Sequence, residues 1–193
     1  MMRLAFVIYD DMTLLDFAGV FDPLTRLRSM EFVPDLEYDI CAREERVRSS
    51  EGVVLIPDTR RPELAQYDYV LIPGGDGVRN LMQDRDFLSW LSVAPGSTTL
   101  AAVCGGALLL GATGRLRDRR ATTHPTLLGA LRHFVREVSS DRIVEDGDTI
   151  TAGGVTAAID LGLHICERIA GPGVREKIRA QMDYPCLPCQ AAR

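Results

Sequence analysis

The stretch Thr98-Thr-Leu-Ala-Ala-Val-Cys-Gly-Gly-Ala-Leu-Leu-Leu-Gly-Ala112 decides the fold class of this chain and its candidate chemistry. Apolar and β-branched residues lead into Cys104, two glycines follow at once, and an Ala/Leu-rich helical segment begins. A buried strand that turns sharply into a helix at a reactive side chain has the geometry of a nucleophile elbow. A cysteine at a helix N-terminus also meets the positive end of the helix dipole, which favours the nucleophilic thiolate.

The stretch alone leaves a second interpretation open. Cysteine is among the most buried residue types, so Cys104 could be no more than a small apolar side chain at a strand end. The rest of the chain has to decide between the two interpretations.

The composition is that of an ordinary globular protein. The chain has 193 residues, of which 46% are hydrophobic and 25% charged, so we expect a single domain over residues 1–193 with its core at about 3–182 and a short C-terminal tail. The net charge of −5 argues against a nucleic-acid partner. We see no signal peptide and no apolar run of the roughly 18 residues that span a membrane. We therefore expect a cytoplasmic protein with no membrane partner.

The five cysteines do not form a disulfide pattern, because their number is odd and their spacing uneven. Cys186-Leu-Pro-Cys189 is a CxxC pair in a proline-bearing tail with no second pair, and we interpret it as incidental. His133 and His164 lie on expected helices with spacings that do not converge on a metal. The sequence therefore predicts no metal site.

Strand and helix patterns alternate along the chain. We expect strands at 4–8, 38–42, 53–56, 69–72, 98–103 and 121–123, a hairpin at 142–145 and 149–151, and helices at about 12–21, 78–93 (broken near Asp84), 104–112, 126–135, 155–170 and 174–182. This order predicts a doubly wound, mostly parallel α/β sheet with helices on both faces. Ligands of such sheets bind beyond the carboxyl ends of the strands, where both Gly74-Gly75 and Cys104 fall. This shared crevice favours a functional Cys104.

Five motifs occur together in a fixed order: Leu14-Leu-Asp-Phe-Ala-Gly19, Ile72-Pro-Gly-Gly75, Val103-Cys-Gly-Gly-Ala107, Ala121-Thr-Thr-His-Pro125 and Ile150-Thr-Ala-Gly-Gly-Val-Thr-Ala-Ala-Ile-Asp160. Together they resemble the ThiJ/PfpI superfamily, which has a class I glutamine-amidotransferase-like fold. The resemblance implies a flavodoxin-like sandwich, a reactive cysteine on a strained elbow and a homodimer. It also implies that an acidic residue of the first helix, here Asp16, is hydrogen-bonded to the cysteine.

Two positions narrow the resemblance. Peptidase members have His after the nucleophile, where this chain has Gly105, and glyoxalase or deglycase-like members generally have Glu in place of Asp16. An Asp at that position resembles the isocyanide hydratases, as do Leu108-Leu-Leu-Gly-Ala-Thr-Gly-Arg-Leu116 and Gly153-Gly-Val-Thr156. Those hydratases usually have Thr where this chain has Gly105, so a hydroxyl that could contact the substrate is missing.

The candidate site consists of six residues. Cys104 and Asp16 are the catalytic candidates; Asp16 lies within an otherwise apolar helical face, where an unpaired carboxylate would be costly. The backbone N–H groups of Gly74, Gly75 and Gly105 are candidates for stabilising developing negative charge, although Gly74 and Gly75 could simply form a tight turn. The resemblance places His124 near the cysteine as a substrate-binding candidate. The alternative is that His124 is a structural residue beside Pro125. We interpret Thr122 and Thr123 as strand residues.

The expected activity is the hydration of an organic isocyanide to an N-substituted formamide through a thioimidate on Cys104, without a cofactor. The same residues would also serve a glyoxalase or deglycase-type enzyme that acts on 2-oxoaldehydes. A third hypothesis is a non-enzymatic sensor of cysteine oxidation, because exposed thiols of low pKa are readily oxidised.

Overall fold

The computed structural model describes residues 1–93, 96 and 98–185. Its centre is a seven-stranded sheet in the order β10-β11-β7-β6-β1-β2-β5. The pairings within it are parallel except that of β10 with β11. The strands are β1 (Arg3–Val7), β2 (Glu37–Ala42), β5 (Thr59–Arg60), β6 (Tyr69–Ile72), β7 (Thr99–Val103), β10 (Ile143–Asp146) and β11 (Thr149–Ala152). The predicted doubly wound α/β fold is confirmed.

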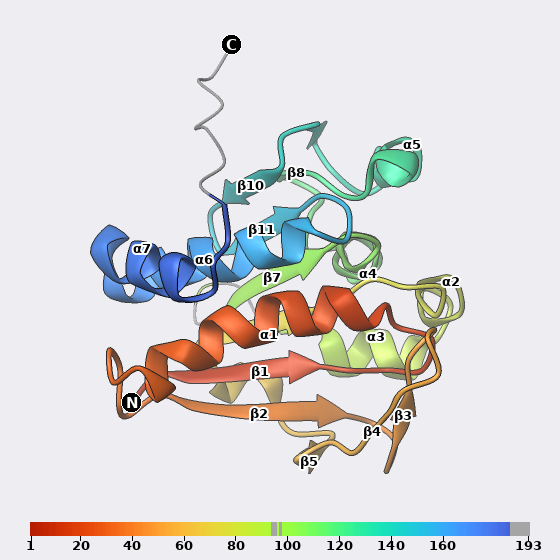
Figure 1. The fold of residues 1–193 in the computed structure, drawn as a ribbon. Helices are drawn as coiled ribbons and strands as arrows, with labels where there is room; N and C mark the ends of the chain where they lie inside the picture. Colours follow the sequence, from red (N-terminus) through yellow and green to blue (C-terminus); the bar gives the residue numbers. More distant parts are fainter. Residues whose placement is uncertain (94–95, 97, 186–193) are drawn as a thin grey trace.

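Helices cover both faces of this sheet (Figure 1). On one face α1 (Leu14–Ser29) packs against α6 (Ala157–Ala170), and α7 (Pro172–Gln181) packs on α6. The short helices α2 (Val78–Leu81), α3 (Arg85–Leu91) and α4 (Gly106–Ala112) lie on the other face. Outside the sheet lie β3 (Val47–Arg48) paired with β4 (Val54–Leu55), β8 (Arg120–Ala121) paired with β9 (Glu137–Val138), the 3-10 turns η1 (Leu64–Gln66) and η2 (Pro125–Leu127), and α5 (Leu128–Leu131).

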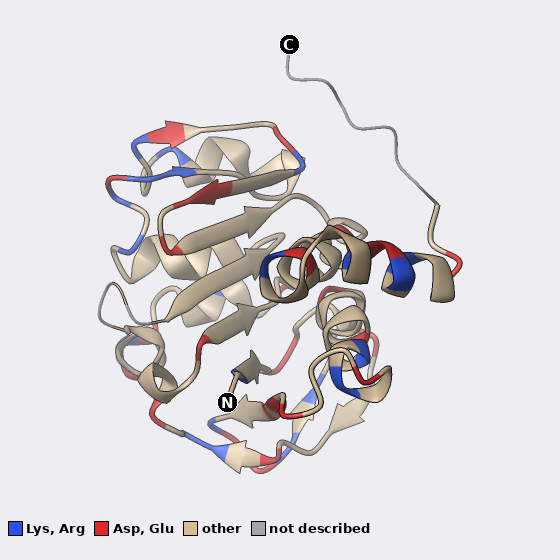
Figure 2. Ribbon diagram, turned by 90° about the vertical axis from the view of Figure 1, so that its left-hand side faces the viewer, with Lys and Arg blue, Asp and Glu red and all other residues tan. Residues whose placement is uncertain are grey.

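The central strands are apolar because both of their faces are covered. Strands β6, β7 and β11 carry no charged residue, and Figure 2 shows the charges gathered on the helices, loops and outer strands around them. The α1–α6 contact is close: a Cβ on Gly19 would lie 2.7 Å from the Cβ of Ala158. This packing fixes the position of α1, and with it the position of Asp16, against the sheet.

The structure differs from the sequence prediction in three places. The expected strand 53–56 is reduced to Val54–Leu55, which pairs with β3 outside the main sheet, and Ile56 is exposed. The expected helix 126–135 is a 3-10 turn followed by the single turn of α5. Thr122 and Thr123 come after β8 instead of within a strand. The predicted break at Asp84 is confirmed, because its carboxylate caps α3 through the N–H groups of Asp86 and Phe87.

The structure bears on the expectation about membrane-spanning segments but not on the one about the CxxC pair. Among the described residues, no helix combines the length and the apolar character needed to cross a bilayer. Cys186 and Cys189 lie outside the described residues.

Candidate active site

Cys104 lies at the turn between β7 and α4, at the carboxyl end of the sheet. Its φ is +55°, a left-handed conformation that costs a non-glycine residue roughly 1–2 kcal/mol. Three hydrogen bonds hold it there: its N–H donates to the carbonyls of Ala152 (3.1 Å) and Gly153 (2.9 Å), and its carbonyl accepts from the Thr123 hydroxyl (2.6 Å). The structure therefore has the strained elbow that the sequence pattern predicts.

Asp16 approaches Cys104 from the first turn of α1. Its side chain is fully buried, and Oδ2 accepts the Gly74 N–H at 2.9 Å. A Cβ built on Gly74 would lie 2.9 Å from Asp16 Oδ2 and also 2.9 Å from the Cβ of Cys104. The carboxyl and the thiol thus converge on one glycine and interact with each other. Asp16 Oδ1 is buried without a hydrogen-bond partner, so it is the oxygen available to take up a proton.

The two side chains control each other's protonation. Burial raises the pKa of Asp16 to about 6, against the opposing effects of the Gly74 N–H and the Cys104 thiol. Burial, followed by the charge of Asp16, raises the pKa of Cys104 to about 11, although the N–H groups of Gly105 and Val155 act to lower it. These effects outweigh the helix-terminus effect that the sequence suggested, and the resting sulfur is a thiol. At neutral pH the pair is a carboxylate beside a thiol, and it holds one transferable proton.

The three glycines have different functions. The Gly74 N–H is already bonded to Asp16, so it is not free to stabilise substrate charge as the sequence suggested; it holds the acid instead. Gly75 has a φ of +133°, and a Cβ there would lie 2.5 Å from the Cα of Met12. Within the described residues its N–H has no acceptor. Gly105 directs its N–H at the Cys104 sulfur. The N–H groups of Gly75 and Gly105 therefore remain the candidates for binding negative charge.

His124 is half-buried and is held by its own loop. Its Nδ1 lies 2.8 Å from the Thr126 hydroxyl and accepts the Thr126 N–H at 3.3 Å. A Cβ on Gly154 would lie 3.0 Å from His124 Nε2, so the ring rests on the backbone of Gly154. Gly154 directly precedes Val155, whose N–H interacts with the thiol. The described contacts place His124 against the wall of the site and give it no hydrogen bond to Cys104.

Sequence reasoning did not identify Tyr9, Thr123 or Val155 as site residues. The Tyr9 hydroxyl is buried and donates to the carbonyl of Pro73 at 2.6 Å, just before Gly74. Burial, then Asp16, then Cys104 raise its pKa well above the ordinary value, so it stays a neutral phenol. Its place at the carboxyl end of an apolar strand was a usable signal. The backbone role of Val155 and the bond from Thr123 to Cys104 depend on the fold and had no sequence signal.

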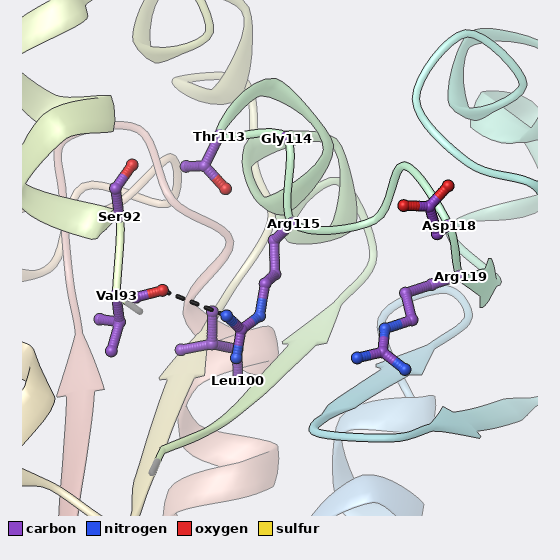
Figure 3. Close-up of a pocket in the computed structure, with 8 residues that line it drawn as sticks. All are labelled: Ser92, Val93, Leu100, Thr113, Gly114, Arg115, Asp118 and Arg119. Carbon is purple, nitrogen blue, oxygen red and sulfur yellow. Dashed lines mark hydrogen bonds between the residues drawn. The ribbon is translucent and has the colours of Figure 1, made fainter. Parts of the chain in front are cut away.

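A cavity of about 540 Å³ lies elsewhere, at the amino end of β7. Figure 3 shows Arg115 and Arg119 beside it. Arg115 pairs with Asp148 at 2.7 Å, and Arg119 pairs with Asp148 at 3.1 Å and with Asp146 at 3.3 Å, so both guanidinium groups already have carboxylate partners. None of the candidate site residues lines this cavity. Within the described part of the chain, no three His, Cys, Asp or Glu side chains are grouped so that they could hold a metal ion.

The elbow, the buried acid and the glycine turn are parts of one recognisable architecture. Residues 2–168 match the DJ-1/PfpI family. The chain belongs to this family. An isonitrile hydratase from Pseudomonas putida is 32% identical over 97% of this chain and 80% of its own length. A glutathione-independent glyoxalase, DJR-1.2 from Caenorhabditis elegans, is 27% identical over 74% of this chain and 76% of its own length. The family thus includes enzymes of two different activities.

Solved structures agree with this assignment. A ThiJ/PfpI family protein from Pseudomonas syringae has a TM-score of 0.86 at 27% identity, covering 100% of this chain and 79% of that one. Drosophila melanogaster DJ-1beta has a TM-score of 0.83 at 22% identity, covering 96% of this chain and 99% of that one, and it shows the fold alone.

Proposed function

We propose that this protein hydrates an organic isocyanide (isonitrile) to an N-substituted formamide. The observation that carries the proposal is the buried pair of Asp16 and Cys104, which holds one transferable proton at neutral pH. An isocyanide carbon must accept both a nucleophile and a proton, and this pair can supply both. The similarity to an isonitrile hydratase over 97% of the chain supports the same substrate class.

In the first half-reaction the Cys104 thiol adds to the terminal carbon of the isocyanide. Asp16 Oδ1 takes the thiol proton as the sulfur–carbon bond forms, and then delivers it to that same carbon. The product is a thioimidate in which the former isocyanide carbon carries sulfur, hydrogen and a double bond to nitrogen. The thiol is neutral until the substrate arrives, so the nucleophile is generated only where it is used.

In the second half-reaction water adds to the thioimidate carbon. Asp16 takes one proton of the water and the nitrogen receives the other, which gives a tetrahedral intermediate with its negative charge on oxygen. The N–H groups of Gly75 and Gly105 are the candidates to stabilise negative charge on its oxygen. The carbon–sulfur bond then breaks, Asp16 returns a proton to sulfur, and the formamide leaves. The steps balance with water as the sole co-reactant.

A product assay tests the proposal. We expect the purified protein to convert a simple alkyl isocyanide into the corresponding formamide, which proton NMR detects. We also expect an adduct on Cys104 to accumulate, which intact-protein mass spectrometry detects. Cys104→Ala is the matched control and should give neither product nor adduct. Formamide production by Cys104→Ala at the wild-type rate would refute the covalent route.

Glyoxalase-type conversion of a 2-oxoaldehyde is the second candidate, and the similarity to a glyoxalase from Caenorhabditis elegans favours it. The same thiol would form a hemithioacetal with the aldehyde, and Asp16 would move the proton between carbons. Incubation with methylglyoxal and detection of lactate discriminates the two activities. The structure argues against the oxidation-sensor hypothesis, because Cys104 is only 9% exposed and the pKa of its thiol is raised to about 11.

A further inference from the structure

The hairpin formed by β3 and β4 is attached to the segment that leads into α1. The Arg48 N–H donates to Asp10 Oδ1 at 2.7 Å, and the Arg48 carbonyl accepts the Asp11 N–H at 2.8 Å. The Ser50 N–H donates to the carbonyl of Met12 at 2.9 Å. These contacts bring the turn of the hairpin to the start of the helix that carries Asp16.

Glu51, in that turn, occupies the helix terminus. The preceding residue, Thr13, makes no side-chain cap to α1, and Glu51 Oε2 accepts the N–H of Leu14 at 3.0 Å instead. The first N–H groups of a helix lack intrahelical acceptors, so an external carboxylate there both satisfies a donor and meets the positive end of the dipole. Asp16 stands in the same first turn, two residues further on.

We propose that Glu51 is a positioning residue for Asp16: it fixes the helix turn from which the acid reaches Cys104, and its negative charge makes the Asp16 carboxylate a stronger base toward the thiol proton. That this charge assists isocyanide hydration rests on the function proposed above. Without Glu51 the positive helix terminus would favour the ionised form of Asp16. The negative charge of Glu51 offsets the field of the helix terminus without contacting Cys104.

The charges around Asp16 support this assignment. Within the described residues the titratable groups that act on Asp16, or on which it acts, are Cys104, Tyr9 and Glu51. Burial raises the pKa of both the Cys104 thiol and the Tyr9 phenol, so these two are neutral at pH 7. Burial also acts to raise the pKa of Glu51, but the N–H groups of Leu14 and of Glu51 itself outweigh it and hold the pKa below its usual value. Glu51 is therefore the charged neighbour of the three.

The rate of Cys104 alkylation by iodoacetamide against pH reads out the protonation of Asp16 without any isocyanide. In the wild type the rate should rise with pH, flatten near pH 6, where Asp16 ionises and its charge opposes formation of the thiolate, and rise again toward the Cys104 pKa of about 11. Asp16→Asn should lose the flattening and so identify it. Peptide mapping assigns the label to Cys104.

Glu51→Gln keeps an oxygen that can accept the Leu14 N–H and removes the charge. We expect its flattening at a lower pH than in the wild type, by a few tenths of a unit, as is typical of a solvent-exposed charge. High salt should move the wild-type profile toward that of Glu51→Gln, because salt screens exposed charges. Glu45→Gln is the matched control: Glu45 is 83% exposed and pairs with Arg60, so its profile should be unchanged.

A Glu51→Gln profile identical to the wild type, with the same salt response, would overturn the electrostatic part of the proposal. Glu51→Asp keeps the charge and should retain a profile closer to the wild type than Glu51→Gln does; a larger displacement would also count against it. The proposed hydration can fail separately: a shifted Glu51→Gln profile in a protein that makes no formamide rejects the activity and retains Glu51 as the positioning residue.

Discussion

Asp16→Asn should make the protein more stable and almost inactive. Asp16 is fully buried, and its pKa is raised from 3.8 to about 6. At about 1.4 kcal/mol per pH unit, its ionisation opposes folding by about 3 kcal/mol at neutral pH. Asn has nearly the same shape and can still accept the Gly74 N–H, but it carries no charge. The gain in unfolding temperature should be roughly 6–12 °C for a chain of this size.

The sign of the pH dependence makes this test specific. A carboxyl with a raised folded-state pKa contributes most to stability below its unfolded value, and that contribution is lost as the pH rises through about 6. The stability advantage of Asp16→Asn should therefore grow by about 2 kcal/mol between pH 4 and pH 7.5. Thermal unfolding followed by circular dichroism at several pH values measures it.

The refuting result is a difference in stability between Asp16→Asn and wild type that stays constant from pH 4 to pH 7.5. That result would mean that the Asp16 carboxyl titrates normally and is not desolvated. Formamide production by Asp16→Asn at more than a tenth of the wild-type rate would separately refute its role in proton transfer, since general acid–base groups contribute roughly 100-fold or more.

Three further predictions follow from the site. Hydration should rise with pH through about 6 as Asp16 ionises and fall toward 11 as Cys104 loses its proton; a rate independent of pH between 5 and 8 would contradict this. Thr123→Val removes the hydrogen bond to the Cys104 carbonyl, so it should lower the free energy of unfolding in urea by about 1 kcal/mol and lower kcat. Thr123→Ser keeps the hydroxyl and should recover both. An unchanged kcat in Thr123→Val would mean that this hydrogen bond does not hold Cys104 in its reactive conformation. Iodoacetamide should label Cys104 before Cys41 and Cys166, whose pKa values burial raises to about 12, and earlier labelling of either would count against a reactive elbow.

The sequence predicted the fold well where patterning and topology agree. The apolar runs of β1, β6 and β7 identify a sheet covered on both faces, and the glycines after Cys104 mark the elbow. The predicted strand at 53–56 was wrong in extent, because a short apolar run does not reveal whether a sheet or solvent will face it. Local pattern also could not distinguish the 3-10 turn and short helix after His124 from one continuous helix.

The sequence predicted which residues form the candidate site better than it predicted their protonation states. Cys104 and Asp16 were identified from motif and from the cost of a carboxylate among apolar residues. The sequence did not predict that Cys104 is a neutral thiol. Burial and the charge of Asp16 raise its pKa more than the helix terminus lowers it, and both of these effects depend on tertiary structure. Gly74 illustrates the same limit: its N–H was expected to face substrate, and the structure directs it at Asp16.

The placement of Asp16 and Cys104 on separate segments has a consequence for folding. Asp16 comes from the first helix, Gly74 follows β6, Cys104 follows β7, and the carbonyls that hold the elbow come from the end of β11. Parallel strands joined by crossovers form contacts that are distant in sequence, and such contacts are slow to close. Asp16 and Gly74 precede Cys104 in the chain, whereas the carbonyls of Ala152 and Gly153 follow it. During synthesis on the ribosome, Cys104 therefore emerges after its acid but before the strand that holds its elbow, and the site is completed only when β11 adds to β7.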